Sequence, residues 1–282
     1  TVTDQTAPSL AVPNGIIVPA ANSAGTSATV VPIQELLGAA TATDNIDEIV
    51  TITNDAPSDF PLGTTTVTFT AVDEAGNSVT GTTGVTVSDL NGPSVTAPSN
   101  VTIAALDADG TPASSSSIAI FLQGATASDN VDAVVSVTSD APAVLPIGST
   151  VVTFSASDLA GNLGSATATI TVTDQAGPDV TPPEAITVAA DNADGTPAGN
   201  ESIAAFLTGA SASDNVDSSV PVTNNAPATF PLGETVVVFS ATDAAGNGSQ
   251  MLVSLSINNL DEVAPEITSG NSINAIDENS GS

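Results

Sequence analysis

The 282-residue chain contains no lysine, arginine, histidine or cysteine. Without cysteine it can form neither disulfides nor thiolate metal sites. Without histidine it lacks the commonest metal ligand and a common general base, and without lysine it cannot form a Schiff base. Tryptophan and tyrosine, on whose rings sugars usually stack, are absent as well. These absences predict that the protein is not an enzyme, and they disfavour a carbohydrate-binding adhesin.

Acidic residues give the chain a strong negative charge: 31 aspartates and glutamates make the formal net charge −31. Such a charge disfavours binding to nucleic acid or anionic membranes, and only cations can relieve it. A hydrophobic fraction of 41%, in alternating patterns, indicates a folded chain rather than a disordered one. No run of 18 apolar residues occurs, so no transmembrane helix is expected. Because no signal peptide is found and residues 1–4 resemble the end of a repeat, we expect a processed form or a segment of a longer protein.

Three acidic motifs recur with a period of 85 residues and no insertions. An Asp-Asn-x-Asp motif lies at residues 44–47, 129–132 and 214–217. An Asp-x-Ala-Gly-Asn motif lies at residues 73–77, 158–162 and 243–247. An aspartate that closes a Thr/Val run recurs as Asp4, Asp89 and Asp174. A fixed period indicates one structural unit in tandem, which predicts modules at 5–89, 90–174 and 175–259, between the end of a preceding module (1–4) and a further segment (260–282).

Alternating residues predict a β-hairpin in each module. Residues 64–73, TTTVTFTAVD, place Val67, Phe69 and Ala71 on one face and threonines on the other, as in a half-buried strand. A second strand follows the Asp-x-Ala-Gly-Asn turn, whose glycine and asparagine tolerate left-handed backbone angles. The expected strand pairs are 64–73 with 84–89, 149–158 with 167–174, and 234–243 with 252–258.

Three further strands are expected upstream in each module, which in the second are residues 101–105, 118–127 and 134–138. Six or seven short strands with frequent turns predict an all-β fold, an elongated tandem array of antiparallel, immunoglobulin-like β-sandwiches. Because threonine and valine dominate and no 3.6-residue period appears, no helix is expected. The phenylalanines, most at repeating positions, are predicted core residues: Phe60, Phe69, Phe121, Phe154, Phe206, Phe230 and Phe239. The acidic loops at 107–110 and 191–195 miss the EF-hand spacing, so we expect tight turns there.

The order of the motifs resembles a known family. Asp-Asn-x-Asp, Pro-x-Gly-x-Thr-x-Val-x-Phe, Asp-x-Ala-Gly-Asn and a Thr-Val-Thr-Asp ending closely resemble the hyalin-repeat (HYR) module over the last half of each repeat. The resemblance implies immunoglobulin-like extracellular units of adhesive and matrix proteins, although the chain lacks the cysteines of some members. Residues 264–270 and 276–279 resemble the opening of a bacterial cadherin-like module, in which Glu278 would be a calcium ligand.

The acidic segments are expected to meet at one pole of each module. If the last strand runs away from the pole where the chain enters, the hairpin turn before it lies at that pole, next to the linker aspartate. By analogy with the family, the Asp-Asn-x-Asp turn lies there too. A hard divalent cation would relieve the repulsion among three or four carboxylates, and Ca²⁺ accepts six to eight oxygens at loose sequence spacing. A single Asp-Asn turn is more often a plain capped loop, but three convergent motifs favour calcium. The predicted ligands are Asp4, Asp44, Asp47, Asp73, Asn77, Asp89, Asp129, Asp132, Asp158, Asn162, Asp174, Asp214, Asp217, Asp243, Asn247 and Glu278.

Together these features predict a calcium-rigidified, extracellular repeat segment of a large adhesin or filament protein, secreted or on a bacterial cell surface. Its expected partners are Ca²⁺ and the neighbouring modules of the same long chain. Two alternatives stay open. One is a fibre subunit that pairs with other chains along strand edges, since no lysine guards those edges. The other is a carbohydrate- or cell-binding adhesion module.

Overall fold

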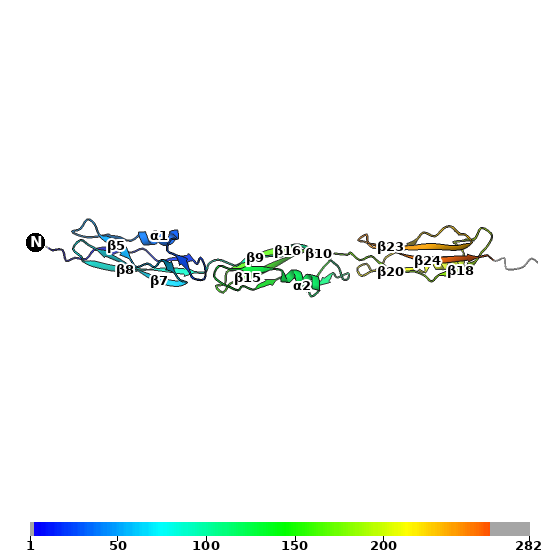
Figure 1. Ribbon diagram of the computed structural model, residues 1–282, viewed down its shortest axis with the longest axis horizontal. Coiled ribbons are helices and arrows are strands. Elements are labelled where there is room, and N and C mark those ends of the chain that lie inside the picture. Colours follow the sequence, from blue (N-terminus) through cyan, green and yellow to red (C-terminus); the bar gives the residue numbers. More distant parts are fainter. Residues whose placement is uncertain (1–2, 260–282) are drawn as a thin grey trace, which may run out of the picture. The chain divides into compact units, whose positions relative to one another are not determined.

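The structure, a computed structural model, describes residues 3–259. Two compact units divide the chain: Thr1–Ile103 with Gly110–Thr173, and Ala104–Asp109 with Asp174–Ser282. Each of the three repeats has eight strands and one helix in the same order along the chain (Figure 1). The fold is therefore all-β with one short helix per module.

The element bounds repeat closely from module to module. The first module has β1 (Ser9–Ala11), β2 (Ile16–Pro19), β3 (Thr26–Ser27), α1 (Val31–Gly38), β4 (Thr41–Thr43), β5 (Thr51–Asn54), β6 (Asp59–Phe60), β7 (Gly63–Val72) and β8 (Ser78–Ser88). The second has β9 (Ser94–Thr96), β10 (Val101–Ala104), β11 (Thr111–Pro112), α2 (Ser116–Gln123), β12 (Thr126–Ser128), β13 (Val137–Ser139), β14 (Val144–Leu145), β15 (Gly148–Ser157) and β16 (Leu163–Thr173). The third has β17 (Asp179–Thr181), β18 (Ile186–Ala189), β19 (Thr196–Pro197), α3 (Glu201–Thr208), β20 (Ser211–Ser213), β21 (Val222–Asn224), β22 (Thr229–Phe230), β23 (Gly233–Thr242) and β24 (Gly248–Asn258).

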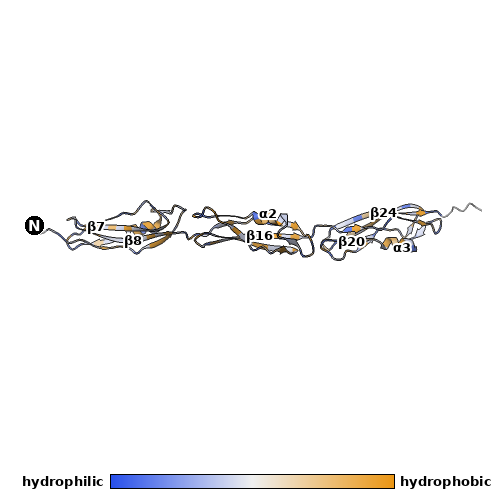
Figure 2. Ribbon diagram, turned by 90° about the horizontal axis from the view of Figure 1, so that it is seen from below, coloured by the Kyte–Doolittle hydropathy of each residue, from blue (hydrophilic) through white to orange (hydrophobic). Residues whose placement is uncertain are grey.

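A four-stranded sheet forms the larger layer of each module. Its strand orders are β2-β8-β7-β5, β10-β16-β15-β13 and β18-β24-β23-β21. Two short two-stranded sheets complete each module, β1-β4 and β3-β6 in the first. Many hydrophobic residues lie on the strands and helices (Figure 2). The prediction of an all-β, sandwich-like fold is confirmed.

The predicted hairpin is the most regular element of each module. β7 and β8 are antiparallel and pair from Gly63↔Val87 to Val72↔Ser78. The side chains of Val67, Phe69 and Ala71 are fully buried, as their alternation predicted. β8 begins at Ser78, six residues before the expected start at 84. The segment before residue 84 has little apolar alternation of its own, and pairing with the complete β7 makes it a strand.

One strand pair contradicts the expectation of wholly antiparallel sheets. β2 runs parallel to β8, with Ile16 opposite Val85 and Pro19 opposite Ser88. β18 pairs with β24 in the same parallel manner. The prediction was wrong because a period of two residues identifies a strand but not the direction of its neighbour.

The helices correct the expectation that the modules contain none. α1, α2 and α3 are eight residues each, and α2 occupies most of the segment 118–127 that was expected to be a strand. Each helix buries two apolar side chains three residues apart: Ile33 and Leu36, Ile118 and Phe121, Ile203 and Phe206. Residues at this spacing lie on one helix face, and packing of that face against the core overrides the β propensity of the surrounding sequence.

The phenylalanines are core residues, as predicted. All seven are at most 6% exposed. Phe121 on α2 lies 5.8 Å between ring centroids from Phe154 on β15, and Phe206 lies 5.6 Å from Phe239. Aromatic pairs at this distance and tilt stabilise a core beyond their buried area. These contacts fix α2 and α3 on the four-stranded sheets of their modules, so that the sheet and helix support the loops at their ends.

The acidic loops before the helices are tight turns, as predicted. In the third module the Asn192 side-chain oxygen Oδ1 accepts a hydrogen bond from the Asp194 amide at 2.9 Å. Asp107 does the same for the Asp109 amide at 2.9 Å. Gly195 directly follows Asp194 in the third module and has φ +113°. A Cβ at this position would lie 1.9 Å from the Phe230 carbonyl oxygen. Only glycine fits this approach, so these loops are built for packing.

Candidate metal centres

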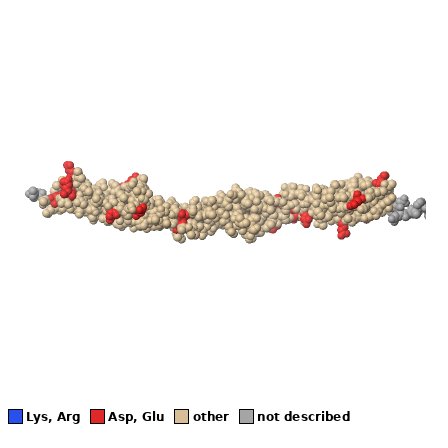
Figure 3. Space-filling model, in the orientation of Figure 1, with Lys and Arg blue, Asp and Glu red and all other residues tan. Residues whose placement is uncertain are grey.

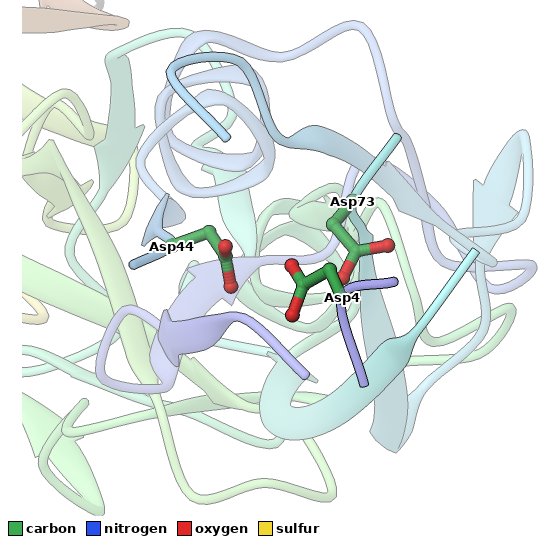
Figure 4. A group of neighbouring side chains, drawn as sticks. All are labelled: Asp4, Asp44 and Asp73. Atoms are coloured by element: carbon green, nitrogen blue, oxygen red, sulfur yellow. The ribbon is translucent and has the colours of Figure 1, made fainter. Parts of the chain in front are cut away.

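Each module holds one compact group of three aspartates. The groups are Asp4, Asp44 and Asp73; Asp89, Asp132 and Asp158; and Asp174, Asp217 and Asp243. Within each group, one carboxylate oxygen of every residue lies within 4.8 Å of the others. The three carboxylates of the first group turn toward one another (Figure 4). The space-filling view shows acidic patches and no basic residue on the visible face (Figure 3).

Three separate segments contribute to each group. In the first module Asp4 precedes β1, Asp44 directly follows β4, and Asp73 directly follows β7. The strands are anchored in the core, so they hold the ends of these segments at one pole of the module. This is the convergence that the sequence predicted, and the same segments meet in the second and third modules.

The hairpin turn fixes the most buried member of each group. Asp73 is 6% exposed, and its Oδ1 accepts a hydrogen bond from the Asn77 amide at 2.7 Å. The Asn77 side-chain nitrogen donates to Asp73 Oδ2 at 2.7 Å and also to the Asp4 carbonyl oxygen at 3.4 Å. Asn77 therefore fastens the linker to the turn through its donor atoms. Asn162 and Asn247 make the equivalent bonds.

The Asp-Asn-x-Asp loop is held by both of its aspartates. Asp44 Oδ1 accepts hydrogen bonds from the amides of Ile46 at 2.9 Å and Asp47 at 3.2 Å. Asp47 Oδ2 accepts one from the Glu74 amide at 2.9 Å, which ties this loop to the hairpin turn. Asp132 and Asp217 make the same cross-link to the amides of Leu159 and Ala244. The two loops thus form one frame around the carboxylates.

At the pole of each module, two carboxylate oxygens are buried without a hydrogen-bond partner. They are the Oδ2 atoms of Asp4 and Asp44, of Asp89 and Asp129, and of Asp174 and Asp214. Buried polar atoms are nearly always satisfied, and a buried ionised oxygen without a partner is costly. No basic side chain exists in the chain to pair with them. The pattern recurs at the same two positions in all three modules, so each pole presents two unpaired oxygens beside the compact group.

The predicted ligand positions fall into three kinds. The linker aspartate and the aspartate of the hairpin turn belong to the compact group in every module. Of the two aspartates in the Asp-Asn-x-Asp loop, the first joins the group in the first module, and the second joins it in the other two. The three asparagines act as donors to the frame. Glu278 lies outside the described residues.

Burial and like charges act most strongly on the linker aspartates. Burial is the main cause that raises the pKa of the Asp89 carboxyl, although the Asn91 amide donates a hydrogen bond to it. Neighbouring negative charges raise that pKa further, namely those of Asp129, Asp158 and Asp132. The pKa of Asp174 is raised by burial and by its own neighbours, Asp214, Asp243 and Asp217. In the second and third groups, the linker aspartates are therefore carboxyls whose ionisation is opposed by burial and by neighbouring negative charge.

Other carboxyls at the same poles are stabilised in the ionised form. Hydrogen bonds from the amides of Asp132 and Val131 lower the pKa of Asp129. Burial raises the pKa of Asp243, but hydrogen bonds from the side chain and amide of Asn247 outweigh it, so the pKa is lowered overall. The groups thus hold negative charge near neutral pH, and a cation is the species that would relieve it.

The raised pKa values predict a pH dependence that can be measured. A carboxyl with a raised pKa contributes stability that is fully present below its unfolded-state value, near 3.8, and lost as pH rises through its folded-state value. In calcium-depleted buffer we expect the Asp89→Asn/Asp174→Asn variant to gain thermal stability over the wild type as pH rises from about 3.5 to about 7. Thermal unfolding followed by circular dichroism measures it.

Calcium should change this comparison, because a bound cation favours the ionised carboxylates. At saturating calcium and neutral pH the wild type is expected to be the more stable protein. If the melting temperatures of the variant and the wild type differ by the same amount at both pH values in the absence of calcium, the linker carboxylates are not under repulsion.

Comparison with known proteins identifies relatives of the chain. A model of the HYR domain matches residues 3–87, 88–172 and 178–254. Hyalin of Lytechinus variegatus is 35% identical over 276 residues, which are 96% of this chain and 50% of that protein. Hyalin of Strongylocentrotus purpuratus is 31% identical over 246 residues, which are 84% of this chain and 20% of that protein. The chain thus spans half the length of the first relative and a fifth of the second.

Cadherin ectodomains are among the solved structures that match the chain. Mouse cadherin-23 EC22-24 matches with a TM-score of 0.32 and 16% identity, covering 90% of this chain and 99% of that one. Human CDH23 EC21-23 matches with a TM-score of 0.35 and 13% identity, covering 87% of this chain and 100% of that one. The human desmocollin-1 ectodomain matches with a TM-score of 0.30 and 15% identity, covering 93% of this chain and 63% of that one. Among residues 3–259, no helix has the length and apolar character needed to cross a bilayer.

Proposed function

Because the chain belongs to the HYR-domain family, we propose that it is a structural, non-enzymatic repeat segment of a large extracellular protein, stiffened by calcium at the pole of each module. Both curated relatives are hyalins, from Lytechinus variegatus and Strongylocentrotus purpuratus. A secreted or cell-surface location is part of the proposal. The relatives lend no support to a bacterial source.

The unpaired buried oxygens carry the proposal. In each module the linker aspartate and the first loop aspartate direct a buried, unpartnered Oδ2 toward a pole that already holds a compact carboxylate group. Carboxylate oxygens without cysteine or histidine are the ligand set of a hard cation, and Ca²⁺ tolerates irregular geometry and high coordination numbers better than Mg²⁺. The proposed ligands in the first module are Asp4, Asp44 and Asp73, with Asp47 beside them, and the equivalents in the other modules follow the 85-residue period.

A bound ion would join the incoming linker to the two loops of the module that follows it. Binding energy then becomes folding and orientation energy, because the unfolded chain does not assemble the site. Extracellular calcium sites typically have dissociation constants of roughly 10⁻⁴ to 10⁻³ M. At free calcium tenfold above the dissociation constant, one ion stabilises the folded site by about 1.4 kcal/mol. Linkers fixed in this way resist bending.

Small-angle X-ray scattering on the full chain tests this proposal. We expect the maximum dimension to increase, and the distance distribution to sharpen, when about 5 mM calcium replaces EGTA. Magnesium at the same concentration is the control for simple charge screening and should have a much smaller effect. A maximum dimension that is the same in calcium and in EGTA would contradict calcium rigidification.

A further inference from the structure

The Asp-Asn-x-Asp loop of the second module also contacts the first module. The side-chain nitrogen of Asn130 donates a hydrogen bond to the carbonyl oxygen of Ala20 at 2.9 Å. Ala20 directly follows β2 and is 2% exposed. The neighbouring residue of the loop, Val131, packs against the hydrophobic core of the first module, which includes Val18. The two central residues of the loop therefore lie on the preceding module, while the two flanking aspartates belong to the acidic pole.

The same contact recurs in the second compact unit. The side-chain nitrogen of Asn215 donates to the carbonyl oxygen of Ala105 at 3.1 Å. Ala105 is 5% exposed and occupies the position of Ala20, one period later. The segment Ala104–Asp109, which begins with the last residue of β10, belongs to the same compact unit as Asn215. Each compact unit therefore contains one hydrogen bond of this kind.

The first module supplies an internal comparison. In its loop Asp44 Oδ1 accepts a hydrogen bond from the Ile46 amide at 2.9 Å, and in the loop of the second module Asp129 Oδ1 accepts one from the Val131 amide at 2.8 Å. The two loops therefore contain the same turn. Ile46, however, is 58% exposed, whereas Val131 is half-buried. The loop conformation is thus a property of each module, and burial of its apolar residue follows from the presence of a module before it.

We propose that the central Asn130-Val131 pair of the second module's Asp-Asn-x-Asp loop is the latch that seats this module on the first one, and that the cation held by the flanking aspartates closes it. The second half of this inference rests on the proposed function. Asp129 Oδ1 accepts hydrogen bonds from the amides of Val131 and Asp132, so the shape of the loop depends on the position of the Asp129 carboxylate. Without a cation, repulsion with Asp89 and Asp158 would push that carboxylate away from them. The ion would restore the loop, and with it the position of Asn130.

Paired spin labels on the full chain test the latch. The chain has no cysteine, so Thr66→Cys and Val151→Cys place one label on an exposed strand position in each of the first two modules. Pulsed electron–electron double resonance measures the distribution of distances between the two labels, including its width. The test variant is Asn130→Ala/Val131→Ala. The matched control is Asn45→Ala/Ile46→Ala, which makes the equivalent change in the loop of the first module.

Calcium is expected to narrow the distribution in the unsubstituted chain and in the control, but not in the Asn130→Ala/Val131→Ala variant at saturating calcium. Coupling is reciprocal, so that variant should also bind calcium at the second module roughly five-fold more weakly or worse. Equal narrowing in both double variants would overturn the latch. Failure of the unsubstituted chain to bind calcium in equilibrium dialysis would instead overturn the proposed function, and with it the closing by a cation.

Discussion

Replacing Asp158 by asparagine is expected to remove the calcium site of the second module. Asp158 is 9% exposed and belongs to the compact group with Asp89 and Asp132. Asparagine keeps the size of the side chain but removes one negative charge and one carboxylate ligand, and hard cations depend on both. We expect the full chain to lose about a third of its bound calcium, because one of three equivalent sites is lost. Equilibrium dialysis at millimolar calcium measures this loss directly.

The control substitution removes one negative charge at a residue that belongs to none of the compact aspartate groups. Glu184→Gln alters an exposed acid just before β18, and it should leave the amount of bound calcium unchanged. The unsubstituted first and third modules act as internal standards, since Asp73 and Asp243 hold the same position in their groups. Undiminished calcium binding by Asp158→Asn would mean that the compact group is not the metal centre.

Truncating Phe154 to alanine is expected to have the largest effect on stability. Its ring is fully buried on β15 and contacts the ring of Phe121 on α2. A buried Phe→Ala change leaves a cavity and typically costs about 3–5 kcal/mol. That is a large part of the roughly 5–15 kcal/mol that stabilises a whole domain. Because the helix and sheet of the second module meet at this pair, the backbone amides of both should lose their protection against hydrogen exchange together.

Hydrogen exchange followed by mass spectrometry localises the effect. The most protected amides of β15 and β16 should exchange roughly 100-fold faster or more in Phe154→Ala, while those of β7 and β23 stay as they are. Val134→Ala is the matched control, because Val134 is 86% exposed in the same module and its truncation should cost at most about 0.5 kcal/mol. Similar exchange in the two variants would exclude the Phe121–Phe154 contact as a main source of stability.

The hairpins and the core were predictable because their information is local. The alternation around Phe69 specifies both a strand and its buried face, and the Asp-x-Ala-Gly-Asn turn fixes the position of the hairpin. The short helices were not predicted. Each helix is only eight residues long and buries only two apolar side chains, such as Ile118 and Phe121, which is too few to establish a 3.6-residue period. Packing against the sheet decides between a helix and a strand, and that packing involves residues far apart in the sequence.

The acidic pole shows the same division. The sequence by itself determined that equivalent aspartates recur every 85 residues with no basic partner, so that their negative charges repel wherever they meet. Only the tertiary structure decided which oxygens are left unpaired, because the Glu74 amide reaches Asp47 Oδ2 only where the two loops fold against each other. It alone showed that Asn130 contacts Ala20, 110 residues away. Charge and period are properties of a chain, whereas hydrogen-bond partners are set by which strands the core brings together.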